Sequence, residues 1–120
     1  MPLIYICSPL SAPTRAEMLA NMKNAAACSI LAEREFQGRA VAPHAYLPYL
    51  LDDSVPEERA LALEFGQKLL ALCSSMVVCG TRISEGMRAE IESAGRLGIP
   101  VFYRPDMPGV YEQGGDPDAM

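Results

Sequence analysis

The sequence has no tryptophan, a single histidine and four cysteines, and no two cysteines form a Cys-x-x-Cys pair. Zinc sites draw their ligands mainly from clustered cysteine and histidine side chains, so this ligand count argues against a metal site. The cysteines lie in apolar stretches, which predicts reduced thiols in the core. They are Cys7, Cys28, Cys73 and Cys79. We expect no metal and no cofactor.

The chain also lacks a basic cluster and a long apolar run. Its formal net charge is −5, so a nucleic-acid polymer, which selects basic surfaces, is not an expected partner. No apolar run reaches the roughly 20 residues of a membrane-spanning helix, so no membrane partner is expected. A basic region followed by an apolar segment is missing from the N-terminus. We therefore expect no signal peptide and predict a cytoplasmic protein.

Half of the 120 residues are hydrophobic, which is enough for one domain with a single core. The predicted strands are 3–7, 39–43, 77–79 and 100–103, and the predicted helices are 14–37, 54–73 and 84–97. Alternating strands and helices indicate a parallel sheet with helices on both faces. We predict an α/β domain over 1–104: a flavodoxin- or Rossmann-like three-layer sandwich with a four- or five-stranded parallel sheet. Residues 105–120, rich in proline, glycine and aspartate, are predicted to form a surface tail.

Cap residues mark where the predicted helices begin and end. Thr14 with Glu17, and Ser54 with Glu57, have the spacing of a capping box, and Gly38 stands where a helix stops. The segment 45–53 is interpreted as either a loop or a partial helix. The side chains expected to face the core are Leu19, Met22, Ala26 and Ile30 in the first helix and Leu61, Phe65, Leu69 and Leu72 in the second.

Charges on the third helix predict which side faces solvent. At about 100° per residue, Arg88, Glu92 and Arg96 form an i,i+4 ladder on one face. The opposite, core-facing side is expected to carry Met87, Ile91, Ala94 and Leu97. Glu90 falls on the inward side, where a carboxylate is costly unless it is bonded or needed. A satisfied structural carboxylate and a functional group both fit this pattern.

Ligands of parallel sheets bind beyond the carboxyl ends of the strands. In this chain those ends are Ser8-Pro9, Pro43-His44, Gly80-Thr81 and Arg104. Ser84, the expected N-cap of the third helix, follows the third strand closely. The topology therefore predicts that one crevice collects Tyr5, Ser8, His44, Ser84, Gly86 and Glu90.

The pattern Ser84-x-Gly86-Met87-x-x-Glu90-x-x-x-Ala94, with Gly98-Ile99-Pro100-Val101 after it, resembles the nucleoside 2-deoxyribosyltransferase-like superfamily. That superfamily includes the deoxyribonucleoside 5′-monophosphate N-glycosidases. The segment 4–9 resembles its first strand and loop. The segments 42–44 and 51–53 and the region of Gly66 look closer to a small uncharacterised branch common in phages and bacteria. The resemblance covers roughly residues 3 to 104.

The resemblance implies cleavage or transfer at the N-glycosidic bond of a nucleoside or nucleoside 5′-monophosphate. Glu90 matches the carboxylate nucleophile that attacks C1′ of the sugar, and Tyr5 matches a sugar-contacting tyrosine. His44, Asp52 and Asp53 are candidates to protonate the leaving base, and His44 is taken as the second catalytic residue. The expected substrate-binding residues are Tyr5, Ser8, Pro9, Asp53, Gly80, Ser84, Gly86 and Met87, with Ser84 and the amides near Gly86 on the phosphate. Relatives generally assemble, which implies a homo-oligomer, a dimer or larger.

Other interpretations stay open. The superfamily usually carries aspartates at the positions of Gly66 and Ser74, so the usual acid is missing here. The alternative function is a non-catalytic nucleotide-binding protein, a sensor or a sponge, on the same fold. A third is a structural module in which Glu90 only ties its helix to the sheet. Likewise, His44 fits a backbone-bonded strand end and Ser84 a simple N-cap.

Overall fold

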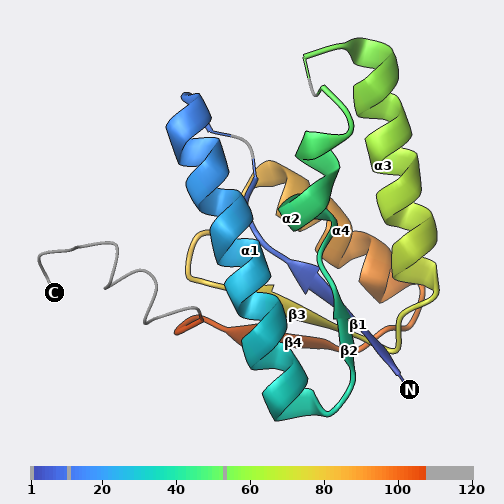
Figure 1. The fold of residues 1–120 in the computed structure, drawn as a ribbon. Coiled ribbons are helices and arrows are strands. Elements are labelled where there is room, and N and C mark those ends of the chain that lie inside the picture. Colours follow the sequence, from blue (N-terminus) through green and yellow to red (C-terminus); the bar gives the residue numbers. More distant parts are fainter. Residues whose placement is uncertain (1, 11, 53, 108–120) are drawn as a thin grey trace, which may run out of the picture.

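The computed structural model describes residues 2–10, 12–52 and 54–107, which form three layers around a four-stranded parallel sheet (Figure 1). The strands are β1 Leu3–Cys7, β2 Arg39–Val41, β3 Ser75–Cys79 and β4 Val101–Arg104. Their order across the sheet is β2-β1-β3-β4, and every neighbouring pair is parallel. The predicted α/β class with a parallel sheet is confirmed.

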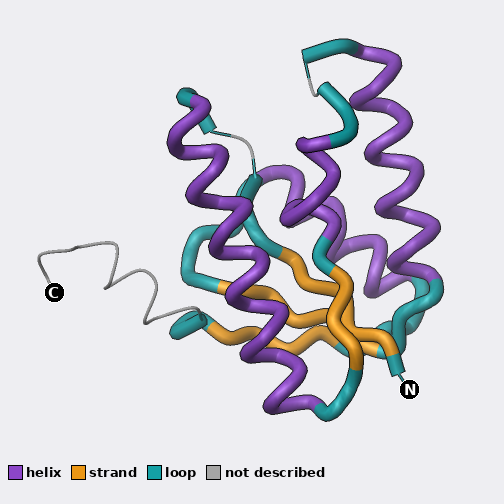
Figure 2. Tube along the Cα trace, viewed as in Figure 1, coloured by secondary structure: helices purple, strands orange, loops and turns teal. Residues whose placement is uncertain are grey.

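Helices cover both faces of the sheet, as the tube in Figure 2 shows. The helices are α1 Arg15–Phe36, α2 Pro43–Tyr46, α3 Pro56–Ala71 and α4 Glu85–Arg96, with a 3₁₀ turn at Leu47–Tyr49. α1 packs on one face with α2 beside it, and α3 and α4 pack on the other. No helix in the described ranges is long and apolar enough to cross a membrane.

Side chains alternate along β1 and divide the core in two. Ile4 and Ile6 pack toward α1, whereas Tyr5 and Cys7 pack toward α3 and α4. The chain runs from β1 to β2 on one side and then crosses to β3 on the other, so the strand order reverses between β1 and β3. In open α/β sheets this reversal point is where ligands bind.

The ends of α1 correct one expected role. Thr14 is the predicted N-cap and accepts a hydrogen bond from the Glu17 amide at 3.1 Å. At the other end Gln37, not Gly38, takes the left-handed conformation, with φ of 53°. Gly38 is required for space instead, because a Cβ there would lie 2.9 Å from the Pro2 carbonyl oxygen.

The start of α3 also differs from the prediction. Its N-cap is Val55, and Pro56 occupies the first turn, where a missing amide hydrogen costs nothing. Ser54 is outside the helix, and its amide and hydroxyl both donate to Asp52 Oδ1, at 2.9 and 2.7 Å. The predicted capping box between Ser54 and Glu57 is therefore wrong. The predicted strand 39–43 is shorter as well, because Pro43 already begins α2.

Helix faces were the least accurate part of the prediction. The predicted core side chains that lie exposed are Leu19, Ile30, Leu61, Phe65, Leu72 and Leu97. Met22 is buried as predicted, and Ala26 and Leu69 are partly buried against the core. α1 packs in the core through Ala25, Cys28 and Ala32, and α3 through Leu70. Small residues on α1 let its backbone approach the sheet closely, so larger apolar side chains beside them remain outside.

The predicted surface tail begins inside the described residues. Residues 105–107 form a turn after β4 in which the Met107 amide donates to the Arg104 carbonyl at 3.1 Å. Met107 then packs among the core residues on the α1 side. The tail prediction is therefore wrong for Met107, whose apolar side chain is buried. Positions 108–120, like Ser11 and Asp53, lie outside the described residues.

Candidate functional site

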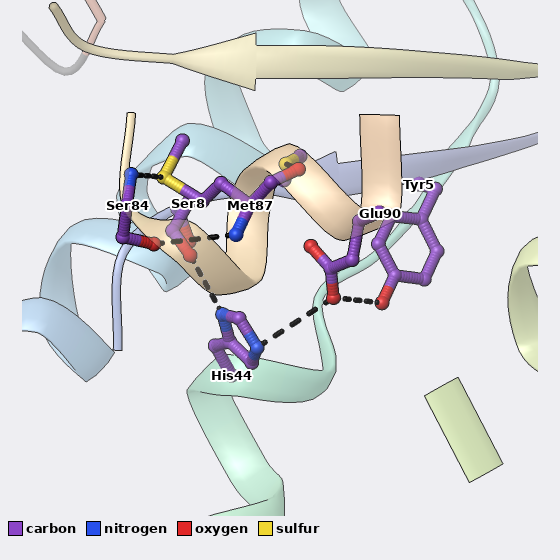
Figure 3. A network of polar contacts seen from close by, with 7 residues as sticks. Tyr5, Ser8, His44, Ser84, Met87 and Glu90 are labelled. Carbon is purple, nitrogen blue, oxygen red and sulfur yellow. Dashed lines mark hydrogen bonds and ion pairs between the residues drawn. The ribbon is translucent and has the colours of Figure 1, made fainter. Parts of the chain in front are cut away.

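A tyrosine from β1 and a glutamate from α4 meet at the carboxyl end of the sheet (Figure 3). The Tyr5 hydroxyl donates a 2.8 Å hydrogen bond to Glu90 Oε2. Strand alternation turns Tyr5 toward α4, and Glu90 lies in the second turn of that helix on the inward side. The Tyr5 side chain is buried, whereas the Glu90 side chain is 16% exposed. The carboxylate is therefore held in place and still reaches the surface.

His44, on α2, joins this pair from the end of β2. Its Nδ1 lies 2.7 Å from the Ser8 carbonyl oxygen, and its Nε2 lies 3.8 Å from Glu90 Oε2. Because a carbonyl oxygen only accepts hydrogen bonds, Nδ1 must carry the hydrogen. His44 therefore makes a backbone hydrogen bond, but at the end of β1 and not at the end of β2, where it was expected. This bond also aims Nε2 at the carboxylate.

Two oxygens at this place have no hydrogen-bond partner within the described residues. Glu90 Oε1 and Ser8 Oγ are both covered from solvent and unpaired. A buried polar group without a partner costs about 1–3 kcal/mol. Most buried polar groups in proteins are paired, so each of these two oxygens is a candidate to bind a ligand or a water molecule.

The remaining predicted residues lie at the start of α4 (Figure 3). Ser84 Oγ accepts the Met87 amide at 3.2 Å, and the Ser84 amide bonds Met87 Sδ at 3.4 Å. The Ser84 side chain therefore caps the helix, and Met87 is buried. Gly86 is exposed on the first turn, and Gly80, with φ of 83°, ends β3.

Comparison with known proteins identifies the family of this chain. A family model described as "Domain of unknown function (DUF7768)" matches residues 2–104. The chain belongs to this family. No curated protein matches the DUF7768 chain significantly. Among solved structures, a 2-deoxyribosyltransferase from Bacillus psychrosaccharolyticus is similar, with a TM-score of 0.62 and 16% identity over 84% of this chain and 70% of that one. At this identity the similarity shows a shared fold.

Gly66 of the DUF7768 chain faces the same site from α3. A Cβ at this position would lie 3.4 Å from the Tyr5 hydroxyl, which is ordinary contact distance. A longer side chain here would reach the Tyr5–Glu90 pair. Position 66 therefore brings no carboxylate to the site, and the polar side chains in contact with Glu90 within the described residues are Tyr5 and His44.

A second group of polar residues, which includes Asn21 and Asn24, was not singled out by the sequence analysis. A cavity of about 210 Å³ lies between α1 and the ends of β1 and β3. Its side-chain polar groups come from Asn21, Asn24, Thr81 and Arg82, together with Ser8. The signal was the pair of carboxamides three positions apart in an alanine-rich helix. No group of three or more histidine, cysteine, aspartate or glutamate side chains suited to a metal exists in the described ranges.

Burial determines the protonation of the groups around Glu90. Burial raises the pKa of the Tyr5 hydroxyl far above its ordinary value, and the Glu90 charge raises it further. Cys7 behaves likewise: burial first, then Glu90, raises the pKa of its thiol. Burial also raises the pKa of Cys73, to about 11. Tyr5 and Cys7 therefore stay protonated in the folded DUF7768 chain at neutral pH, and Tyr5 donates to the carboxylate.

These shifts predict a loss of stability in alkaline solution. The ordinary pKa values are 9.0 for the cysteines and 10.0 for Tyr5, and folding raises all three. Below about pH 9 both states hold these protons. Above pH 9 the unfolded chain releases the cysteine protons and above pH 10 that of Tyr5, whereas the folded chain keeps each proton until its raised pKa is reached, at about 11 for Cys73. The free energy of unfolding should therefore fall by about 1.4 kcal/mol per pH unit for each such group.

Urea unfolding between pH 8 and 11 measures this slope. Tyr5→Phe removes one titrating group, so its slope above pH 10 should be shallower than that of the native chain. A free energy of unfolding that stays constant up to pH 11 would contradict the assignment.

Proposed function

We propose that this protein cleaves or transfers the N-glycosidic bond of a nucleoside or nucleoside 5′-monophosphate. Glu90 acts as the nucleophile on C1′ of the sugar. One observation carries the proposal: a carboxylate at the carboxyl edge of the sheet is held by Tyr5, has one unpaired oxygen and faces His44. The fold similarity to a 2-deoxyribosyltransferase supports the same reaction class.

The chemistry needs a carboxylate next to C1′. The bond from C1′ to the base nitrogen breaks, its electron pair leaves with the base, and positive charge develops on the sugar. A carboxylate oxygen of Glu90 then bonds C1′ and forms a glycosyl ester. Water or a second base attacks C1′ in turn, loses a proton to the site, and releases the carboxylate. Water as acceptor gives hydrolysis, and a base gives transfer.

Two neighbours divide the supporting roles. Tyr5 bonds Oε2 and so leaves Oε1 as the oxygen without a partner. His44 is fixed by its Nδ1 contact with Ser8, and its Nε2, when protonated, donates to the leaving base close to C1′. Asp52 is less suited, because it is exposed and its carboxylate is bonded to Ser54.

A second candidate function is a non-catalytic nucleotide-binding protein. It is favoured by the covered position of Glu90 Oε1 and by Gly66, which brings no acid to the site. Assembly into a homo-oligomer stays a prediction. The exposed apolar side chains of α3, among them Leu61 and Phe65, offer a surface for it.

A substrate screen tests the proposal. Ribo- and deoxyribonucleosides and their 5′-monophosphates are incubated with the native chain and with Glu90→Ala, and free base is measured by liquid chromatography. Base release by the native chain alone is expected. A thermal shift without release would favour the binding protein. Neither release nor shift would leave Glu90 with a structural role.

A further inference from the structure

The cavity beside Ser8 occupies the point where the strand order reverses. Its walls are the loop after β1, the loop after β3 and the second and fourth turns of α1. Alternation along the strand turns Ser8 toward α1, opposite to Cys7 and Glu90. Ser8 is 1% exposed, lines the cavity, and has an unpaired hydroxyl. The Ser8 carbonyl is the same group that holds His44. The cavity and the Glu90 site are therefore adjacent and share one residue.

The polar groups of the cavity are mostly uncharged. Asn21 Nδ2 donates to the Leu10 carbonyl at 2.9 Å, which leaves its Oδ1 as an acceptor. Asn24 makes no side-chain hydrogen bond in the described part of the chain, so its carboxamide is available as both donor and acceptor. Among the described residues that line the cavity there is no carboxylate, and Arg82 is the one cation. Free acceptor oxygens disfavour an anion and favour a neutral ligand with donors and acceptors side by side.

The rest of the wall is apolar. Its sulfur and carbon surface comes from Pro9, Cys28, Cys79 and Met107. A flat ring with a polar edge fits such a wall, because its faces pack on the apolar atoms and its edge forms hydrogen bonds with the carboxamides. Asparagine is well suited to this, since one carboxamide matches an adjacent donor and acceptor on a nucleobase edge.

We propose that this cavity binds the hydrogen-bonding edge of an uncharged nucleobase, and that Asn24 selects which base is accepted. The inference rests on the proposed function, which supplies the nucleobase as part of the substrate. The edge of the base that is far from the sugar enters the cavity. The edge that carries the bond to C1′ lies over Ser8, within reach of His44. One ligand then spans both sides of the sheet edge.

Binding of free nucleobases tests this without catalysis. Adenine, hypoxanthine, cytosine, uracil and inorganic phosphate are titrated by calorimetry into the native chain and three variants. Asn24→Leu should weaken binding of the preferred base about tenfold or more. Lys23→Ala, which changes an exposed neighbour on α1, should leave it unchanged. Asn24→Asp, which keeps the shape, should retain only bases that present hydrogen-bond donors.

The outcomes separate this inference from the proposed function. If base binding depends on Asn24 but no base is released from any nucleoside or nucleotide, the base-binding role of the cavity is supported and the glycosidase function is rejected. If base release depends on Glu90 but Asn24→Leu and Asn24→Asp keep the base preference of the native chain, the cavity assignment is overturned and the proposed function stands. The cavity assignment is also overturned if no base binds, or if phosphate binds and Asn24→Leu abolishes that binding.

Discussion

Replacing Glu90 with glutamine is expected to lower base release by about 10³-fold or more. Glutamine has the same shape, and its amide oxygen still accepts the Tyr5 hydrogen bond, so the fold is kept. It lacks the negative charge that stabilises the developing cation and forms the glycosyl ester. Rates of base formation under single-turnover conditions measure the loss.

The matched control is Glu92→Gln on the same helix. Glu92 is exposed on the solvent face of α4, so its substitution should leave the rate within about twofold of the native value. Mass spectrometry of the quenched native reaction should find the sugar on the peptide that contains residue 90. Equal rates in Glu90→Gln and the native chain would remove Glu90 as nucleophile.

Replacing Leu70 with alanine is expected to destabilise the fold by about 2–5 kcal/mol. Leu70 is 0% exposed and is the one residue of α3 that is fully buried against β1 and β3. Truncating its side chain leaves a cavity, because the closely packed neighbours cannot move enough to fill it. Urea unfolding monitored by circular dichroism measures the change.

Leu72 is the matched control for Leu70. It is the same residue type two positions later, but its side chain is 71% exposed. Leu72→Ala should change the free energy of unfolding by no more than about 0.5 kcal/mol. If Leu70→Ala and Leu72→Ala lowered the free energy of unfolding by similar amounts, α3 would pack on the sheet with a different face.

The comparison of Leu70 with Leu72 also explains where sequence analysis succeeded and failed. The order of strands and long helices was predictable, because each strand is a short apolar run and the N-caps of α1 and α4 are recognisable. The buried face of α3 was not predictable, because apolar side chains surround the helix. Leu61, Leu63 and Phe65 are exposed while Leu70 is buried. Only the position of the sheet decides between them.

The site was predictable to a similar extent. The charged ladder on α4 put Glu90 on the inward side, and the strand ends put Tyr5 and His44 nearby. The contact between His44 and the Ser8 carbonyl was not foreseen, because it depends on the short helix α2 that begins at Pro43. Asn21 and Asn24 were missed for a different reason. An asparagine on a helix has the same local pattern whether it faces a cavity or solvent.

The hydrogen bond between Tyr5 and Glu90 joins residues 85 positions apart in the sequence. The ladder that places Tyr5 pairs Ile4 with Ser75, which is equally non-local. Such contacts require closure of long loops, so folds built on them form slowly, on a scale of about milliseconds to seconds. The Tyr5–Glu90 pair and the central ladder depend on the same long-range loop closures. Helices that form from local contacts cannot bring the pair together by themselves, so its recovery after denaturation requires the assembled sheet.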